Sequence, residues 1–381
     1  MAYQVTNPVY AIASNIVSAL GMDTDAHWKA VAAKRTGIRQ YEDAALSPVP
    51  FYASKMDPSQ WQRIHEDTRT DQILSSFEQM AIYSARQALR QCQEPLDLSE
   101  TVLILSTTKG NIEWLDQVPD SRLTLHSSAA VIAERLGLST KPIIISHACV
   151  SGVVATQYGL RLLQSGRYKN ALIVGADRFT RFVLSGFQSF QAIADEACRP
   201  FDAHRKGINL GEAAAAIVLS THPGHEPLAR IVSGSTSNDA NHISGPSRTG
   251  EELSYAITRA FGEGGITASD VDMISAHGTA TLYNDEMESK AFGIAGVARA
   301  PLHSFKGYIG HTLGAAGVVE SAMIIESLRR QQLIPSLGFS ELGVSQALNV
   351  VAEPRPHELN YVLKTASGFG GCNAAAIWAR A

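Results

Sequence analysis

Cys149 stands at a junction where a thiol could act as a nucleophile. The stretch "IIISHACVSG" covers residues 143–152, so the cysteine follows an apolar run and precedes residues typical of a helix start. Free backbone N–H groups and the positive dipole end of such a helix would favour the thiolate and lower the thiol pKa. For a cysteine considered alone, a buried core thiol is the stronger interpretation. It applies more firmly still to Cys92, Cys198 and Cys372, which lie at no such junction.

Two histidines lie in comparable settings in the second half of the chain. His277 ends an apolar run in "SAHGTATLYND", and His311 follows glycines in "FKGYIGHTLGAAG". An imidazole can give or take a proton near neutral pH, although either histidine alone is more often structural. Lys306 lies among apolar and glycine residues, so we expect it to be buried with a partner. Glu320 is the nearest downstream carboxylate that could supply one.

Motifs for metal or nucleotide binding are not found. The sequence has no HExxH, no cysteine and histidine spacing of a ligand set, no P-loop, and no GxGxxG after an N-terminal strand. The glycine-rich "GFGGCN" at 368–373 lies between two predicted strands and not before a phosphate-binding helix. We therefore expect no metal and no bound cofactor.

The elements that must position these residues follow an α/β pattern. Short β-branched runs alternate with longer helical patterns, which predicts strands joined by helices in a buried sheet. Strands are predicted at 101–107, 142–148, 171–177, 214–220, 229–235, 271–278, 361–371 and 374–379. A helix is predicted after the second of these strands, ending at Gly166, and a further one across 314–332.

Two short resemblances between the halves hint at a duplicated α/β unit. The paired stretches are "IISHACVSG" at 144–152 with "MISAHGTAT" at 273–281, and "LGEAAAAIVLS" at 210–220 with "FGGCNAAAIWA" at 369–379. The proline and glycine of "THPGHEP" at 221–227 suit a linker. We therefore expect an N-terminal half over residues 1–222 and a C-terminal half over residues 223–381.

Composition excludes several classes of protein. The chain has 381 residues, 45% hydrophobic and 18% charged, which is ordinary for a globular protein. A net charge of −4 gives no reason to expect nucleic acid as a partner. The apolar run 213–219 is far too short to span a membrane, no signal peptide is apparent, and four scattered cysteines fit a reducing compartment. We expect a cytoplasmic protein.

Five motifs in order carry a resemblance to a known family. They are "SHACVSG", "FDAHRKGINLGEAAAAIVL", "AHGTATLYNDEME", "SFKGYIGHTLGAAGVVE" and "SGFGGCNAAA". In this order they resemble the β-ketoacyl-acyl-carrier-protein synthases, the elongating Cys–His–His condensing enzymes of the thiolase superfamily. The resemblance implies an α/β thiolase fold, with two duplicated βαβαβαββ halves in a layered α-β-α-β-α arrangement.

The resemblance also implies a role for each matching residue. Cys149 would accept an acyl chain from a carrier-protein thioester, His277 and His311 would promote decarboxylation of malonyl-carrier protein, and Lys306 and Glu320 would form a supporting ion pair. The remaining implied roles are an oxyanion site at the N–H groups of Cys149 and Phe369, a gate at Phe369, phosphopantetheine binding by Thr279 and Thr281, and carrier-protein contact by Arg205 and Lys206.

The partners implied are an acyl carrier protein, whose 4′-phosphopantetheine carries the substrates, and a second subunit in a homodimer or a heterodimer with a related chain-length subunit. Departures such as Arg205-Lys206-Gly207 and "TLYND" leave open whether the pathway makes fatty acids or a specialised polyene. The main alternative is a catalytically inactive chain-length-factor-like subunit. Initiating synthases, with Asn in place of His311, and degradative thiolases, with a differently placed second cysteine, fit less well.

Overall fold

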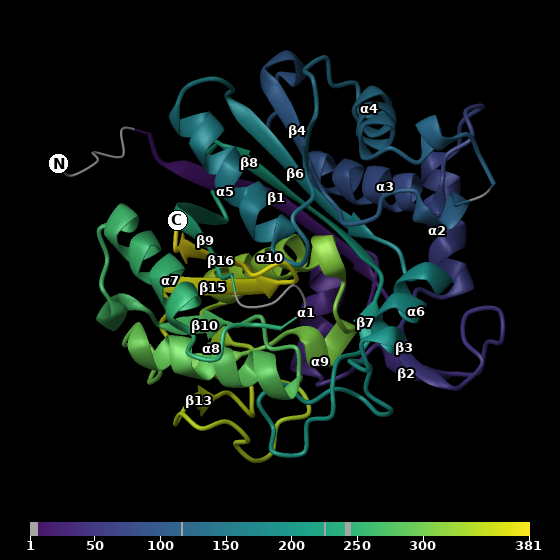
Figure 1. Ribbon diagram of the computed structural model, residues 1–381. Helices are drawn as coiled ribbons and strands as arrows, with labels where there is room; N and C mark the ends of the chain where they lie inside the picture. Colours follow the sequence, from purple (N-terminus) through teal and green to yellow (C-terminus); the bar gives the residue numbers. More distant parts are fainter. Residues whose placement is uncertain (1–6, 116, 225, 241–244) are drawn as a thin grey trace.

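The computed structural model describes residues 7–115, 117–224, 226–240 and 245–381 (Figure 1). Two expectations touch residues outside this set. Residue 225 belongs to the predicted linker, and residues 1–6 belong to the segment in which no signal peptide is apparent.

One large mixed sheet runs through the described part of the molecule, with the strand order β13-β11-β10-β15-β16-β9-β1-β8-β6-β4-β5. Its strands are β1 (Val9–Ser18), β4 (Thr101–Ser106), β5 (Ile143–Ile145), β6 (Asn170–Asp177), β8 (Ala213–Ser220), β9 (Ala229–Asn238), β10 (Met273–Ser275), β11 (Pro301–His303), β13 (Asn349–Val350), β15 (Tyr361–Gly368) and β16 (Cys372–Ala379). Small sheets are formed by β2 (Ile38–Tyr41), β3 (Phe51–Ser54) and β7 (Leu210–Gly211), and by β12 (Gln332–Leu333) and β14 (Arg355–Pro356).

The large sheet contains the same five-strand unit twice. From β1 through β8, β6 and β4 to β5, neighbours pair antiparallel, antiparallel, parallel and parallel. From β9 through β16, β15 and β10 to β11, the order of pairings is identical. The duplication is therefore confirmed, and so is the match of β8 with β16. The match of 144–152 with 273–281 is wrong, because β5 corresponds to β11 and not to β10.

Helices form three layers around the two strand units (Figure 1). They are α1 (Thr24–Ala32), α2 (Pro58–Thr68), α3 (Ser76–Arg90), α4 (Leu125–Arg135), α5 (Ser151–Gln164), α6 (Arg181–Ser189), α7 (Glu251–Gly264), α8 (Leu282–Ile294), α9 (Lys306–Ile309) and α10 (Ala316–Arg330). Helices α3 and α4 cover the first unit, α7 and α8 cover the second, and α5 and α10 lie between them. This is the expected α-β-α-β-α arrangement. No helix in the described ranges is long and apolar enough to cross a bilayer.

The two central helices touch through their backbones. A Cβ added at Gly152 in α5 would lie 2.6 Å from the Val318 nitrogen, and one added at Gly317 in α10 would lie 2.4 Å from the Val153 nitrogen. Real Cβ atoms are not found this close to other atoms, so both positions require glycine. The contact brings the N-terminal ends of α5 and α10 together, and the site is built at these ends.

Candidate active site

Cys149 lies on a sharp elbow between β5 and α5. The strand ends at Ile145, earlier than predicted, because Ala148 adopts φ +45° and turns the chain into the helix. The Ser151 hydroxyl holds this turn by accepting from the His147 N–H at 2.7 Å and donating to the Ala148 carbonyl at 2.6 Å. Such a conformation costs about 1–3 kcal/mol for a residue with a Cβ, so its surroundings must enforce it. The side chain of His147 is exposed in the single chain.

The turn between β15 and β16 packs directly against this elbow. A Cβ at Gly368 would meet the Cys149 nitrogen at 3.0 Å, so a larger residue there would displace the nucleophile. The next residue, Phe369, directs its backbone N–H at the Cys149 thiol. The glycines of "GFGG" thus allow two loops to approach closely. They lie between two strands, as predicted, and not before a helix whose N-terminus could bind phosphate.

His277 projects from a second tight turn, between β10 and α8. The Glu288 carboxylate of α8 accepts from the N–H groups of His277 at 2.8 Å and Gly278 at 2.6 Å. Gly278 has φ +45°, and a Cβ there would lie 2.5 Å from the Ser304 side chain. The turn explains why the predicted strand 271–278 ends at Ser275 in β10.

Lys306 fixes the protonation pattern of His277. Its ammonium group lies 3.3 Å from the His277 Nδ1, donates to the His277 carbonyl, and pairs with Glu320 at 2.8 Å. An ammonium has no lone pair, so Nδ1 must accept and the neutral ring must carry its proton on Nε2. The ion pair expected between Lys306 and Glu320 is present, and both side chains are buried.

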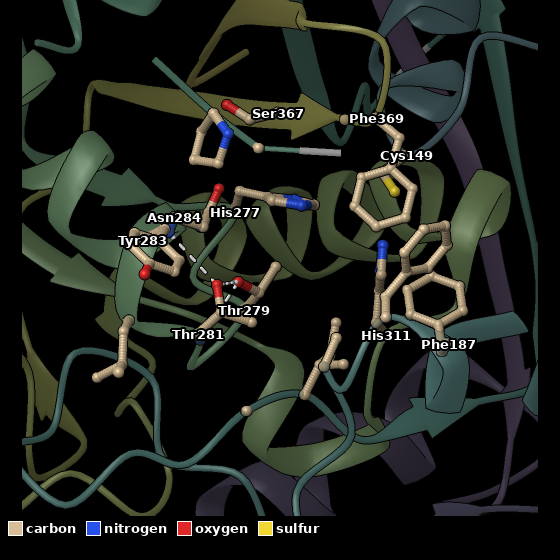
Figure 2. Close-up of a pocket in the computed structure, with 18 of the residues that line it drawn as sticks. Cys149, Phe187, His277, Thr279, Thr281, Tyr283, Asn284, His311, Ser367 and Phe369 are labelled. Atoms are coloured by element: carbon tan, nitrogen blue, oxygen red, sulfur yellow. Dashed lines mark hydrogen bonds between the residues drawn. The ribbon is translucent and has the colours of Figure 1, made fainter. Parts of the chain in front are cut away.

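His311 completes a compact group with Cys149 and His277 (Figure 2). One donor atom from each of the three side chains lies within 4.8 Å of the others. The two imidazoles meet edge to face, with centroids 5.2 Å apart and planes at 86°. All three residues are buried, and neither ring nitrogen of His311 has a hydrogen-bond partner within the described residues. These nitrogens are free to bind a ligand.

Burial decides the charge states of this group. It raises the pKa of the Cys149 thiol to about 11, against the opposing effects of Lys306 and the Phe369 N–H. The lowered thiol pKa expected from the helix end is therefore wrong for the free site. Burial also lowers the pKa of both His277 and His311 well below 6.5, assisted by the nearby Lys306. At neutral pH a protonated thiol faces two neutral imidazoles.

A further buried lysine, Lys364, lies behind the histidines and was not predicted from the sequence. It pairs with the second oxygen of Glu320 at 2.8 Å, so one carboxylate bridges two ammonium groups. Burial alone would raise the pKa of Glu320, but the ammonium groups of Lys306 and Lys364 lower it below its ordinary value. The available signal was a single charged residue inside the apolar run "YVLKTASG".

The three residues lie at the buried end of a pocket of about 400 Å³. Phe369 stands beside Cys149 and stacks on Phe187 with centroids 5.7 Å apart, while Phe190 meets it edge-on at 5.4 Å. Thr279 and Thr281 line the pocket on the side away from the thiol, and their hydroxyls lie 2.9 Å apart (Figure 2). The pocket therefore has a reactive end and a polar wall.

Arg205 and Lys206 occupy different environments. The Arg205 guanidinium is buried and donates to the carbonyls of Asp202 at 2.9 Å and Gly343 at 2.6 Å. This burial argues against the predicted contact of Arg205 with a carrier protein, because its donors are used to hold loops together. Lys206 lines the pocket and is half exposed, with Asp195 3.5 Å and Glu196 3.6 Å away.

Sulfur and imidazole nitrogens are also donors that a zinc ion accepts, and three of them lie within 4.8 Å here. The electrostatic setting is unfavourable for such an ion. Lys306 and Lys364 are buried cations close to the imidazoles, and a dication would be repelled by both in a region of low dielectric. The charges around the three residues therefore disfavour a bound dication.

Comparison with known families gives two matches that together cover most of the chain. Residues 6–225 match the beta-ketoacyl synthase N-terminal domain, and residues 228–340 match the beta-ketoacyl synthase C-terminal domain.

Curated relatives agree with these matches. The 3-oxoacyl-[acyl-carrier-protein] synthase 2 of Mycobacterium bovis is 28% identical, over 97% of each chain. The ketoacyl synthase alpha subunit of the tetracenomycin polyketide synthase of Streptomyces glaucescens is 28% identical, over 94% of each chain.

Solved structures share the fold. The ishigamide ketosynthase/chain length factor superposes with a TM-score of 0.88 at 24% identity, over 98% of this chain and 99% of that one. Other similar structures are ketosynthases in complex with a carrier protein or with a chain length factor. The fold, the Cys–His–His group and both domain matches lead to one conclusion. The chain belongs to the β-ketoacyl synthase family of acyl-transferring condensing enzymes.

Proposed function

We propose that this chain is an elongating β-ketoacyl-acyl-carrier-protein synthase of fatty-acid or polyketide (polyene-type) synthesis. The observation that carries the proposal is the group formed by Cys149, His277 and His311, whose donor atoms lie within 4.8 Å at the buried end of a pocket. One thiol and two neutral imidazoles suit two successive steps, acyl capture and decarboxylative condensation.

In the first step, the Cys149 sulfur attacks the thioester carbonyl of an acyl carrier protein. Because the thiol rests protonated, its proton passes to the neutral imidazole of His311, whose ring nitrogens have no partner among the described residues, as the sulfur–carbon bond forms. The bond between the carbonyl and the pantetheine sulfur then breaks, and the departing thiolate takes that proton. The oxyanion formed on the way would accept from the N–H groups of Cys149 and Phe369, and donors of this kind contribute about 10²- to 10³-fold in rate.

In the second step, the carbon–carbon bond to the carboxylate of a malonyl thioester breaks and carbon dioxide leaves. The electron pair moves onto the thioester oxygen as an enolate, which two imidazole N–H groups would stabilise. The Nε2–H tautomer imposed on His277 by Lys306 supports this role. The enolate carbon then attacks the acyl-Cys149 carbonyl, and the cysteine sulfur departs as a thiolate that takes a proton from solvent. The product is a β-ketoacyl thioester.

Other pocket residues have supporting roles in the proposal. Thr279 and Thr281 would hydrogen-bond the phosphopantetheine arm, and Phe369 would move aside from Phe187 as the gate to the thiol. Lys206, half exposed at the pocket, would meet the carrier protein. Lys306 and Glu320 would act through His277 and not on substrate.

A dimer is supported by the end of the large sheet. β5 is an edge strand, its three isoleucines are only partly covered in the single chain, and an uncovered apolar edge favours pairing with another strand. We propose a homodimer or a heterodimer with a related subunit, in the cytoplasm. We also retain a boundary between residues 222 and 223, since the first strand unit ends at Ser220 and the second begins at Ala229.

The test is acyl transfer to the protein. Incubation with an acyl carrier protein thioester should add the acyl mass to Cys149, and Cys149→Ala should abolish the adduct. The control is Cys92→Ala, a partly buried cysteine just after α3 that does not line the pocket, which should leave the adduct unchanged. A folded wild-type protein that forms no adduct would contradict the proposal and favour the inactive chain-length-factor-like subunit.

A further inference from the structure

Lys364 is a buried charge that the proposed reaction does not use. It lies on β15, its side chain is fully buried, and it pairs with Glu320 at 2.8 Å. Burying an ammonium in a strand is expensive unless the charge is paired and its protons are bonded. Both conditions are met here, so the position of this lysine is fixed on all sides.

The ammonium group also holds the strand end from which His277 emerges. Lys364 pairs in register with Ser275 of β10, and its Nζ donates to the carbonyls of Ser275 at 3.1 Å and Ala276 at 3.4 Å. Ala276 is the residue immediately before His277. Lys364 is therefore connected to the imidazole by two routes, through this backbone and through Glu320 and Lys306.

We infer that Lys364 is a positioning residue of the condensation site, which fixes Glu320 against Lys306 and anchors the strand end that carries His277. The inference rests on the proposed function for its chemical meaning. If it is correct, Lys364 acts on the decarboxylation step, where the His277 donor must be aimed at the enolate oxygen. It has no contact with the thiol and should have little effect on acyl capture.

Lys364 has an electrostatic consequence as well. The charged and titratable groups packed around the two imidazoles are Cys149, Glu288, His303, Lys306, Glu320 and Lys364. Burial holds the pKa of His303 at about 3, so this histidine adds no charge near neutral pH. The ammonium groups of Lys306 and Lys364 both lower the pKa of the two imidazoles. Without Lys364 one of these positive charges is lost, which favours protonation of the imidazoles.

The experiment compares Lys364→Met, Lys364→Met with Glu320→Gln, and the control Leu363→Met, a fully buried neighbour that faces the apolar core under α7. Two quantities are measured on each protein: the imidazole ¹⁵N shifts of His277 and His311 against pH, and the ratio of malonyl-carrier decarboxylation to Cys149 acylation. The NMR measurement needs no substrate, so it reports on Lys364 even if the proposed function fails. The ratio tests the proposed function, because a wild-type protein that does not decarboxylate contradicts it.

For Lys364→Met we expect the imidazole pKa values to rise and decarboxylation to fall by about tenfold or more, part of the ~10²- to 10⁴-fold that a positioned proton donor contributes. Acylation should stay within about twofold. The double variant removes one charge of each sign, so its imidazole pKa values should return toward wild type while decarboxylation stays low, because Lys306 has lost its carboxylate. If Lys364→Met does not fold, the double variant is compared with Glu320→Gln alone, so that only Lys364 differs between the two proteins, and equal imidazole pKa values and equal ratios would overturn the inference. Unchanged shifts together with an unchanged ratio would overturn the inference.

Discussion

At the level of single residues, burial around Cys149 sets the resting protonation state of the site. Because the thiol pKa is about 11, the fraction of Cys149 present as the reactive thiolate keeps rising with pH above pH 8.5, where that of an exposed cysteine levels off. We expect the rate of Cys149 alkylation by iodoacetamide to rise about tenfold per pH unit from pH 7 to pH 10. Mass spectrometry of the Cys149 peptide measures the rate. A plateau near pH 8.5 would contradict the burial argument.

Glu320 should matter for stability as well as chemistry. Glu320→Ala leaves the buried ammonium groups of Lys306 and Lys364 facing one another without their carboxylate. Removing one member of a buried ion pair costs about 3–5 kcal/mol of unfolding free energy. The control is Glu353→Ala, which breaks an exposed pair with Lys34 and should cost about 0–1 kcal/mol. Urea denaturation compares the two, and equal losses would contradict the difference in burial.

Cys149 and His277 each lie at the end of an apolar run, and His311 follows glycines, but these settings alone favour structural roles. The catalytic roles were predicted from the five motifs in their order, whereas the Lys306–Glu320 pair follows from a lysine in an apolar setting. Lys364 was not predicted because a single charged residue inside a strand does not indicate which residue it pairs with. The burial of Arg205 was not predicted, since the sequence does not reveal whether a cation meets solvent or backbone carbonyls.

At the level of elements, the crossing of α5 and α10 is the most sensitive contact near the site. A Cβ at Gly317 would lie 2.4 Å from the Val153 nitrogen, so the helices must separate to admit it. We expect Gly317→Ala to cost about 1–3 kcal/mol of stability, the usual effect of overpacking, and to slow acyl transfer by shifting Cys149.

Gly186 in α6 offers a matched control for this prediction. A Cβ there meets nothing within 4 Å, so Gly186→Ala should be neutral or stabilise by about 0.4–1 kcal/mol. Thermal unfolding and the acyl adduct are measured on both variants. Equal effects of the two substitutions would contradict the conclusion that the helix crossing requires glycine.

All the predicted strands are present, but the strands that lead into the site end a few residues earlier than predicted. Periodicity finds the buried middle of a strand but not the residue at which the chain turns. Ala148 at φ +45° is held by Ser151, three residues along the chain, whereas Gly278 at φ +45° packs against Ser304 and donates to Glu288. The contact of Gly278 with Ser304 joins different elements, and a single sequence carries no record of it, so the exact end of β10 could not be predicted.

For the whole molecule, the uncovered edge of β5 leads to a prediction about assembly. We expect sedimentation to show a species of about 82 kDa, twice the 40.9 kDa chain, that dissociates on dilution. Ser146→Lys, at the exposed end of the edge strand, should weaken association, while Ser269→Lys on an exposed 3-10 turn of the other half should not. A 41 kDa species at every concentration would contradict the proposed homodimer.

The repeated strand unit has a consequence for how such a site can arise. β5 and β11 occupy equivalent places, so the segments that follow them, one carrying Cys149 and the other Lys306 and His311, are counterparts. Their helices meet at Gly152 and Gly317, and the core between them draws apolar residues from both halves. A lone half would expose that surface and would have to associate with a copy of itself. Joining two copies in one chain removes the requirement that both counterparts be identical, which leaves one loop free to specialise as nucleophile and the other in proton donation.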